Sequence, residues 1–230
     1  MQFHRVQTGA LVTALIFILA LAGCSDNDGN AAGFDALPIA NPTVSMPPDA
    51  GGPNLLAQTF SLADVGYEQA EYFLEGTATA FRNVNEFAAD GNWQAEPAGE
   101  ANYRTRILVY RPSDPADFNG RVLMEWLNVT AGFETPPSWG TGQLEMRRGG
   151  SVWIGVSAQL VGIEGSDRGL VPLHLKAVNP DRYGSLVHPG DSFSYDIFSQ
   201  AAQAVREPVG IDPLGGLDAQ YLIAYGESQS

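Results

Sequence analysis

Five residues at the end of the printed sequence have the types and the spacing of a catalytic turn. Gly226-Glu227-Ser228-Gln229-Ser230 directly follows the apolar run Tyr221 to Tyr225. A strand that runs into Gly-x-Ser-x-small is the pattern of a nucleophile elbow, in which a strained turn lifts the serine oxygen above the edge of a sheet. The last small position is Ser230 rather than glycine, which keeps side-chain bulk low but makes the motif less specific. The alternative is an ordinary strand-ending turn rich in Gly and Ser.

Four short runs that are rich in β-branched, aromatic and aliphatic residues are predicted to be strands. Each is bounded by Pro, Gly or Asp, and they span Arg104–Arg111, Arg121–Leu127, Ser151–Ser157 and Tyr221–Tyr225. Three of them are continuously apolar, as strands buried on both faces are. The candidate turn therefore follows the last of several buried strands.

Helical spacing of apolar residues predicts a helix over 192–206, which Ser192 or Asp191 would cap. A weaker helix is predicted over 143–148, ending at Gly149-Gly150. Residues 60–103 contain many aromatic side chains and are predicted to be a β-rich lead-in. The order of strands and helices predicts an α/β domain with a mainly parallel sheet.

Four separated segments resemble a family of poorly characterised α/β-hydrolase-domain proteins. They are RVLMEWLNVTAG (121–132), WIGVSAQLVG (153–162), YGSLVHPGDSFSYDIFSQ (183–200) and GESQS (226–230). The resemblance covers about residues 60 to 230. It implies an α/β-hydrolase-type sheet with flanking helices, and a serine nucleophile in the terminal motif.

The resemblance assigns the reacting groups. Ser228 would be the nucleophile, and an oxyanion formed on the substrate would need backbone N–H donors. One donor in this geometry is the residue after the nucleophile, here Gln229, and the second comes from the loop after an earlier strand. Since Arg121–Leu127 is the matching strand, Asn128 or Val129 is the candidate for the second donor.

In this fold an acid and then a histidine follow the serine in the sequence. The printed sequence has two residues after Ser228. We therefore expect residues 60–230 to be the N-terminal part of a longer hydrolase domain, truncated after the elbow, with the triad acid and histidine beyond it. The 230 residues alone are expected to be inactive.

The sequence also contains histidines and acidic residues before Ser228, and none of them is assigned to the triad. His188 precedes the predicted helix, where it lines the pocket or is a loop histidine bonded to backbone, and His174 is expected to be a partly exposed structural residue. Asp191 and Asp196 are expected to stabilise a helix start, and Glu227 occupies the variable position of the elbow.

Composition excludes other function classes. The chain has 26 acidic against 12 basic side chains and a formal net charge of -14, which disfavours nucleic acid as a partner. No cluster of His, Cys or Asp has metal-ligand spacing, and no glycine-rich nucleotide-binding motif is present, so neither a metal nor another cofactor is expected.

The N-terminus has the layout of a secretory signal. Arg5 precedes a 13-residue apolar run, Ala10 to Ala22, which is interrupted only by Thr13 and is too short to span a bilayer. Leu21-Ala22-Gly23-Cys24 resembles the lipobox of bacterial lipoproteins, in which the cysteine is lipidated. Residues 1–23 are thus predicted to be a signal peptide, and residues 24–59 a flexible tether. The protein is expected to be exported and anchored to a bacterial cell-envelope membrane through lipid on Cys24.

Two functions remain open. The first is a cell-envelope serine hydrolase that transfers acyl groups through Ser228, with a small-molecule ester as substrate. The second is a non-catalytic surface lipoprotein that binds a ligand or partner on a hydrolase-like scaffold, because a fold does not guarantee activity. The oligomeric state is not predicted.

Overall fold

The computed structural model describes residues 38–55, 60–166 and 172–230. The predicted signal peptide, Cys24 and the first part of the predicted tether lie outside the described residues. Within the described ranges, no helix combines the length and the apolar character needed to cross a bilayer.

A seven-stranded sheet has the order β6-β1-β2-β3-β5-β4-β7. The strands are β1 (Thr43–Ser45), β2 (Tyr67–Asn83), β3 (Ala95–Pro112), β4 (Arg121–Trp126), β5 (Val152–Val156), β6 (Val209–Gly210) and β7 (Tyr221–Gly226). The helices are α1 (Pro137–Arg148), α2 (Leu160–Glu164), α3 (Leu175–Val178), α4 (Pro180–Tyr183) and α5 (Ser194–Arg206), with short 3-10 turns at Ala63–Val65, Pro115–Asp117 and Asp191–Phe193. The predicted α/β class is confirmed.

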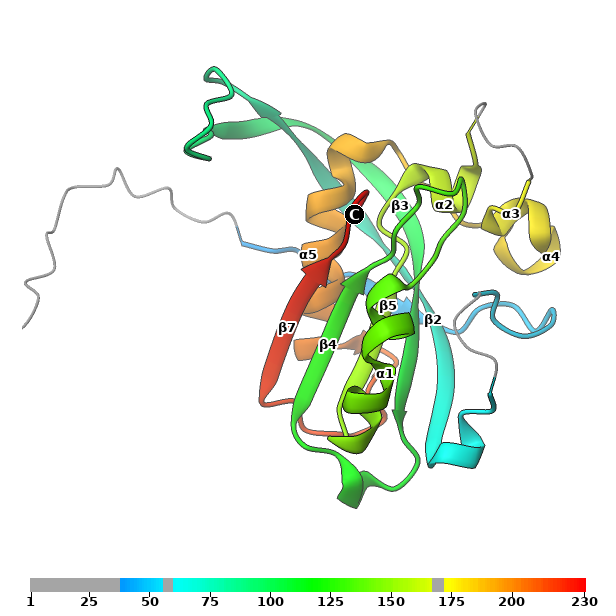
Figure 1. Ribbon diagram of the computed structural model, residues 1–230. Coiled ribbons are helices and arrows are strands. Elements are labelled where there is room, and N and C mark those ends of the chain that lie inside the picture. The colour runs from blue at the N-terminus through cyan, green and yellow to red at the C-terminus, as the bar shows by residue number, and fades with distance from the viewer. Residues whose placement is uncertain (1–37, 56–59, 167–171) are drawn as a thin grey trace, which may run out of the picture. The chain divides into compact units, whose positions relative to one another are not determined.

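The sheet is mixed. Strands β5, β4 and β7 pair in parallel, as do β1 and β6, whereas β1, β2, β3 and β5 are joined by antiparallel pairing. The expected β-rich lead-in forms β2 and the first half of β3, which make one long hairpin whose outer half extends beyond the rest of the sheet (Figure 1). The parallel strands carry the carboxyl-terminal edge at which the Ser228 motif lies.

Helices cover both faces of the sheet, with α5 behind it and α1 in front (Figure 1). The apolar face of α5 contributes Ile197, Ala201, Ala204 and Val205 to a core with the inward residues of β1 to β5. On the other face, Trp139 of α1 packs with Trp153 and Tyr110. The two layers thus bury β5 on both faces, which explains its continuously apolar sequence, whereas β7 remains mostly exposed.

Helix α5 also closes the open edge of β2. Strand β1 pairs with only three residues of β2, Phe73 to Glu75. Beyond them, the Asp196 carboxylate accepts the N–H of Thr79 at 2.7 Å, and Gln200 Nε2 donates to the carbonyl of Thr77 at 2.8 Å. These side chains satisfy backbone groups that an unpaired edge leaves exposed. Asp196 lies in the first turn of α5, where it was expected to stabilise the helix start, but its backbone partner belongs to a β-strand.

The folded domain begins earlier than residue 60. Residues 38–55, predicted to be part of the tether, contain β1, and Val44 is buried. The carbonyls of Pro48 and Gly51 accept hydrogen bonds from Arg182 at 2.9 and 2.6 Å. The Pro- and Gly-rich composition hid this order because the stabilising partners lie outside the segment, in β2 and, for the Arg182 contacts, more than a hundred residues away.

Helix α1 starts six residues before the predicted 143 and ends where predicted. It ends in a Schellman motif, in which the N–H of Gly150 donates to Arg147 and the N–H of Ser151 donates to Met146. Gly150 has a φ of 73°, and a Cβ at this position would lie 1.9 Å from the carbonyl oxygen of Asp117. This position therefore requires glycine both for its conformation and for space.

We expect Gly150→Ala to destabilise the domain by more than about 2 kcal/mol, because a left-handed residue with a Cβ costs roughly 1–2 kcal/mol and the overlap adds to it. Chemical unfolding at equilibrium measures the change. Gly140→Ala is the matched control: it lies within α1 with nothing within 4 Å of the added Cβ, so it should stabilise the domain by up to about 1 kcal/mol. Equal effects of the two substitutions would contradict this account.

Candidate active site at the end of β7

The Ser228 turn has a strained backbone. Strand β7 pairs in parallel with β4 up to Gly226, which lies opposite Trp126. Two residues later Ser228 has a φ of 61°, and among the described residues it is the one non-glycine residue with a positive φ. This conformation disfavours L-residues and concentrates at functional sites. The strand-to-turn transition leaves Ser228 exposed at the carboxyl-terminal edge of the sheet.

Small residues on either side let the turn close. A Cβ at Gly226 would lie 2.8 Å from the Oγ of Ser230 and 3.3 Å from its Cβ. Ser230 Oγ in turn donates to the carbonyl of Glu227 at 2.6 Å. The first and last positions of the motif therefore face each other across the turn, which is the physical reason for their small size.

The loop after β4 reaches the serine turn. Asn128 Nδ2 donates to the carbonyl of Glu227 at 2.8 Å, and the N–H of Val129 donates to the carbonyl of Gln229 at 3.4 Å. The N–H of Asn128 is used elsewhere, because it donates to Thr135 at 3.0 Å in a short antiparallel bridge. Of the two alternatives for the second oxyanion donor, Val129 is thus the one whose N–H lies at the turn in a long, weak hydrogen bond.

The N–H of Gln229 has no hydrogen-bond acceptor among the residues that the structure describes. Its carbonyl is held instead by Gln159 Nε2 at 2.9 Å. Gln159 follows β5, so the loops after both neighbouring strands bind the turn after β7. Gln159 was not singled out in the sequence, although it lies in one of the four resembling segments.

Residues 39–230 match the family model described as alpha/beta hydrolase domain. The chain belongs to this family. A comparison with the curated proteins found no match, and a comparison with the solved structures found none either. Membership agrees with the resemblance seen in the four segments and gives the chain a hydrolase-like scaffold.

A buried carboxylate lies under the turn of this α/β-hydrolase domain. Glu125 of β4 is fully buried, and its oxygens accept the N–H groups of Ser138 and Trp139, at 2.8 and 3.0 Å, and Nε1 of Trp153 at 2.8 Å. It therefore binds the N-terminus of α1, where a negative charge is favoured. Burial raises the pKa of Glu125 against these hydrogen bonds. This tertiary contact explains why α1 begins before the predicted start.

A second buried cluster surrounds Arg106 of β3, whose side chain is inaccessible to solvent. Its guanidinium contacts Glu71 at 2.8 Å, Glu134 at 2.6 Å and Ser157 Oγ at 3.0 Å. Burial opposes its charge, but Glu134 and Glu71 outweigh that effect and raise the pKa of Arg106. Arg106 is one of three arginines in β3, so no local sequence pattern marks this cluster.

Neither His188 nor His174 makes a hydrogen bond to the serine turn among the described residues. His188 is buried, its Nδ1 accepts the N–H of Gly190 at 3.3 Å, and its Nε2 lies 2.9 Å from the carbonyl of Ala158. Because Nδ1 accepts, Nε2 carries the proton and the ring is neutral with both nitrogens engaged. Of the two alternatives for His188, the structure shows the loop histidine that is bonded to the backbone. His174 is partly exposed, as expected.

Asp191 caps a different helix from the predicted one. Its Oδ1 accepts the N–H of Leu160 at 2.9 Å, the first residue of α2, whereas α5 has no side-chain cap. A cap from a distant part of the chain is invisible to sequence spacing. Glu227 is exposed in the turn, with its carbonyl held by Asn128 and Ser230.

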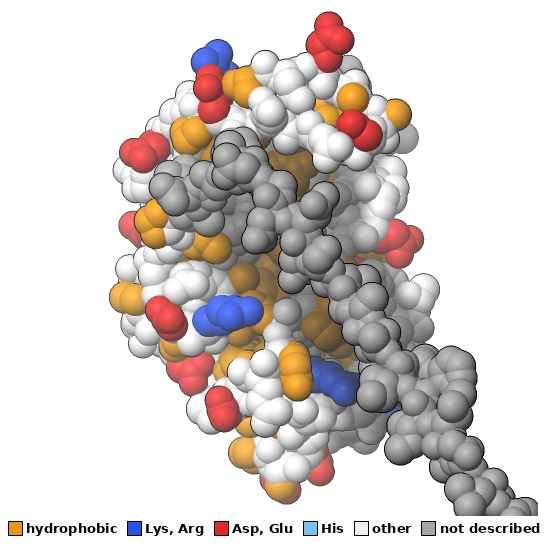
Figure 2. Space-filling view, turned by 90° about the vertical axis from the view of Figure 1, so that its left-hand side faces the viewer, with side chains coloured by type: hydrophobic (Ala, Val, Ile, Leu, Met, Phe, Trp, Pro, Cys, Tyr) orange, Lys and Arg blue, Asp and Glu red, His pale blue; other side chains and the backbone are white. Residues whose placement is uncertain are grey.

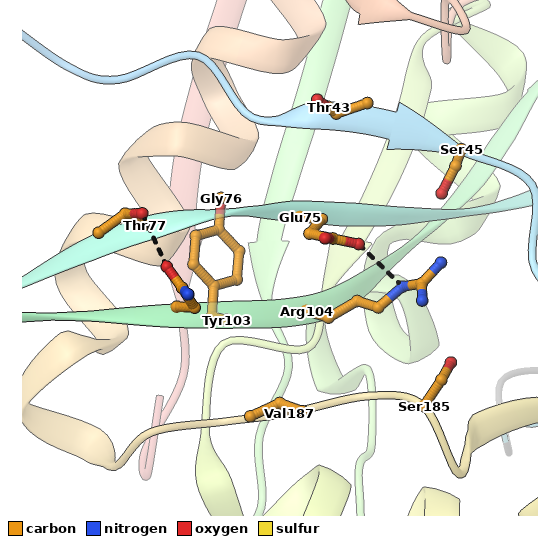
Figure 3. A pocket seen from close by; sticks show the side chains of 10 residues that line it. Thr43, Ser45, Glu75, Gly76, Thr77, Tyr103, Arg104, Ser185 and Val187 are labelled. Atoms are coloured by element: carbon orange, nitrogen blue, oxygen red, sulfur yellow. Dashed lines mark hydrogen bonds and ion pairs between the residues drawn. The ribbon is translucent and has the colours of Figure 1, made fainter.

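A hollow of about 670 Å³ lies away from the serine turn, over β1 to β3 (Figure 3). Its floor is a polar row in which Thr43, Glu75 and Arg104 are neighbours across three strands, and Ser185 and Val187 form one wall. Arg104 Nε lies 3.5 Å from Glu75, whose side chain is 61% exposed. Such an exposed pair contributes little, and this hollow holds none of the residues of the serine turn. Among the described residues, no group of three or more His, Cys, Asp or Glu is placed to hold a metal ion.

The side of the domain that carries β7 and α5 faces the viewer in Figure 2, which shows apolar side chains gathered in its middle. Tyr221 and Ile223 of β7 are exposed, and together with Arg121 and Arg206 they line a hollow. Strand β7 pairs only with β4 among the described strands. The strand that precedes the serine is therefore held from one side only.

We expect the buried neutral His188 to make stability depend on pH. Burial lowers its pKa from the usual value of 6.5, so the unfolded state binds the proton more readily, and stability should be lost as the pH falls from about 6.5 toward the lower folded value. Urea unfolding at pH 7.5 and pH 5.5 measures the loss. His188→Asn should reduce the pH dependence, whereas His174→Asn should leave it unchanged. A parallel reduction in both variants would disprove the assignment to His188.

Proposed function

We propose that this domain belongs to a serine hydrolase that cleaves carboxylic esters of small molecules by acyl transfer through Ser228. The observation that carries the proposal is the strained backbone at Ser228, which presents an exposed hydroxyl at the carboxyl-terminal edge of parallel strands. Strain of this kind is maintained where it serves a function. Membership of the alpha/beta hydrolase domain family supports the same reading.

The reaction follows from the contacts around the turn. Ser228 Oγ would bond to the acyl carbon of the ester, the alcohol would leave with a proton, and water would then release the acid from the acyl-enzyme. The negative oxygen of each tetrahedral intermediate would accept the N–H groups of Gln229 and Val129. The N–H of Val129 would give up its 3.4 Å hydrogen bond to the carbonyl of Gln229. That carbonyl would still accept the 2.9 Å hydrogen bond from Gln159 Nε2.

The proposal assigns neither the triad acid nor the triad histidine to a described residue. Asp191, Asp196 and His188 all have structural partners. In this fold the acid and the histidine follow the serine, so the activity is to be tested on the full-length protein. No metal ion or other cofactor enters the proposed reaction.

We expect a fluorophosphonate probe to label the full-length protein at Ser228, because the probe reacts with an activated serine. Ser228→Ala should abolish the labelling. Ser113→Ala removes another exposed hydroxyl and should leave it unchanged. Equal labelling of the wild type and of Ser228→Ala would refute the serine mechanism and would favour the non-catalytic scaffold that binds a ligand or partner.

We also propose that the protein is exported and anchored to a cell-envelope membrane by lipid on Cys24, the single cysteine of the chain. Stable anchoring needs acyl chains because the acidic body is repelled by anionic headgroups. In cells fed labelled palmitate, the protein should carry the label and sediment with membranes. Cys24→Ser should lose both properties, and membrane retention of that variant without label would contradict lipid anchoring.

A further inference from the structure

A polar row of side chains crosses the sheet at the floor of the hollow over β1 to β3. Thr43, Glu75 and Arg104 are direct cross-strand partners, and Arg104 is bridged to Val187. Residues directly opposite each other point to the same face of a sheet, so the four side chains form one line. At about 4.8 Å per strand the line is roughly 14 Å long. The hollow above it, of about 670 Å³, has the size of a small-molecule site.

The guanidinium group of Arg104 is held in place but keeps free donors. Its Cζ lies over the ring of Phe73, 5.5 Å from the centroid, and its Nε lies 3.5 Å from an oxygen of Glu75. Nε is buried, whereas the side chain as a whole is 32% exposed. Figure 3 shows the two terminal nitrogens turned away from Glu75, between the side chains of Ser45 and Ser185. None of these nitrogens forms a hydrogen bond with a described residue.

Neutral hydrogen-bonding groups complete the lining of the hollow. Beside the row, Thr77 Oγ1 donates to Asn102 Oδ1 at 2.9 Å, and both side chains are exposed. Val187, which is 49% exposed, supplies an apolar surface on one wall. The other hydroxyl groups are those of Thr43, Ser45 and Ser185. The hollow therefore offers donors, acceptors and an apolar surface side by side.

Charge selects the kind of ligand that fits. Among the described residues that line the hollow, Arg104 is the one cation and Glu75 the one anion. A cationic ligand would meet the guanidinium and an anionic ligand the carboxylate, and the net charge of -14 on the chain further disfavours an anion. A neutral ligand with hydroxyl groups on neighbouring carbons fits both side chains, because one hydroxyl donates to Glu75 and the next accepts from Arg104. Its C–H face can contact Val187.

We propose that this hollow binds a short neutral oligosaccharide, whose adjacent hydroxyl groups bond Glu75 and Arg104. The site is separate from the serine turn and does not depend on the hydrolase function. The exposed ion pair at its centre contributes little to stability. Placing it there therefore serves binding better than folding, and the contact with the Phe73 ring fixes the guanidinium before the ligand arrives.

The test titrates the full-length protein with maltose, cellobiose and N,N′-diacetylchitobiose, three neutral disaccharides, in saturation-transfer NMR. We expect at least one of them to receive signal. Glu75→Ala should weaken its binding about tenfold or more, because hydrogen bonds to a charged group are the strong ones. Ser185→Ile removes a hydroxyl beside Arg104, narrows the hollow from an exposed position and should weaken binding as well.

Glu68→Ala is the matched control. Glu68 also lies on β2, is directly opposite an arginine of β3 and forms an ion pair with it, but it does not line the hollow. This variant should bind the disaccharide like the wild type. Signal from none of the three sugars, binding that survives both Glu75→Ala and Ser185→Ile, or an equal loss in Glu68→Ala would overturn the proposal.

Inorganic phosphate distinguishes a sugar site from an anion site. Glu75→Ala removes the negative charge beside Arg104, so it should weaken disaccharide binding, whereas binding of an anion would become stronger. Phosphate that binds the wild type more tightly than the disaccharides, and more tightly still in Glu75→Ala, would overturn the sugar site in favour of an anion site.

The variant Ser228→Ala separates this proposal from the proposed hydrolase function. It should bind the disaccharide like the wild type, because the hollow holds no residue of the serine turn. Loss of sugar binding in Ser228→Ala would place the sugar at the serine and overturn the site described here. A protein that is labelled at Ser228 but binds none of the sugars would overturn the sugar site and leave the hydrolase function standing.

Discussion

The fold of this domain around its candidate site depends on the buried pairing of Arg106 with two glutamates. Glu71 comes from β2, Arg106 from β3 and Glu134 from the loop after β4, and Arg182 of α4 binds the second oxygen of Glu71 at 2.6 Å. Charges taken out of water are tolerated only when each is paired and hydrogen-bonded. Removing any one member would leave an uncompensated charge inside the domain. The cluster thus forces an antiparallel hairpin, a parallel strand's loop and a short helix into one arrangement.

This cluster and the serine turn share a structural element. The loop that carries Glu134 begins at Asn128, and its two ends are joined by the bridge between Asn128 and Thr135. One end of the loop is fixed by Arg106 and the other contacts the turn that presents Ser228. The Glu125 carboxylate adds a second anchor, because it binds the start of α1 and lies in register with Tyr225, the residue before the turn. Burial, followed by the charge of Glu125, raises the pKa of Tyr225.

Much of the scaffold was predictable because its signals are local. The four predicted strands all form, because runs of β-branched, aromatic and aliphatic residues favour strands. The stop of α1 was predictable from two glycines, and the turn after β7 from a pattern of small residues. The start of α1, the strand within residues 38–55 and the partner of Asp191 were not, because each is decided by a side chain or strand from a distant part of the chain.

The sequence by itself determined which residue types lie at the serine turn, because strand propensity, left-handed backbone and small side chains are properties of neighbouring residues. It also determined the family to which the chain belongs, through motifs spread over the domain. Only the tertiary structure decided that Val129 rather than Asn128 has its N–H at the turn, that His188 is engaged by backbone, and that Glu134 pairs with Arg106. Glu134 and Glu71 are separated from Arg106 by 28 and 35 residues in the sequence, and Glu71 and Arg182 are separated from each other by 111. Such pairings depend on which strands become neighbours in the sheet, and no local pattern specifies that.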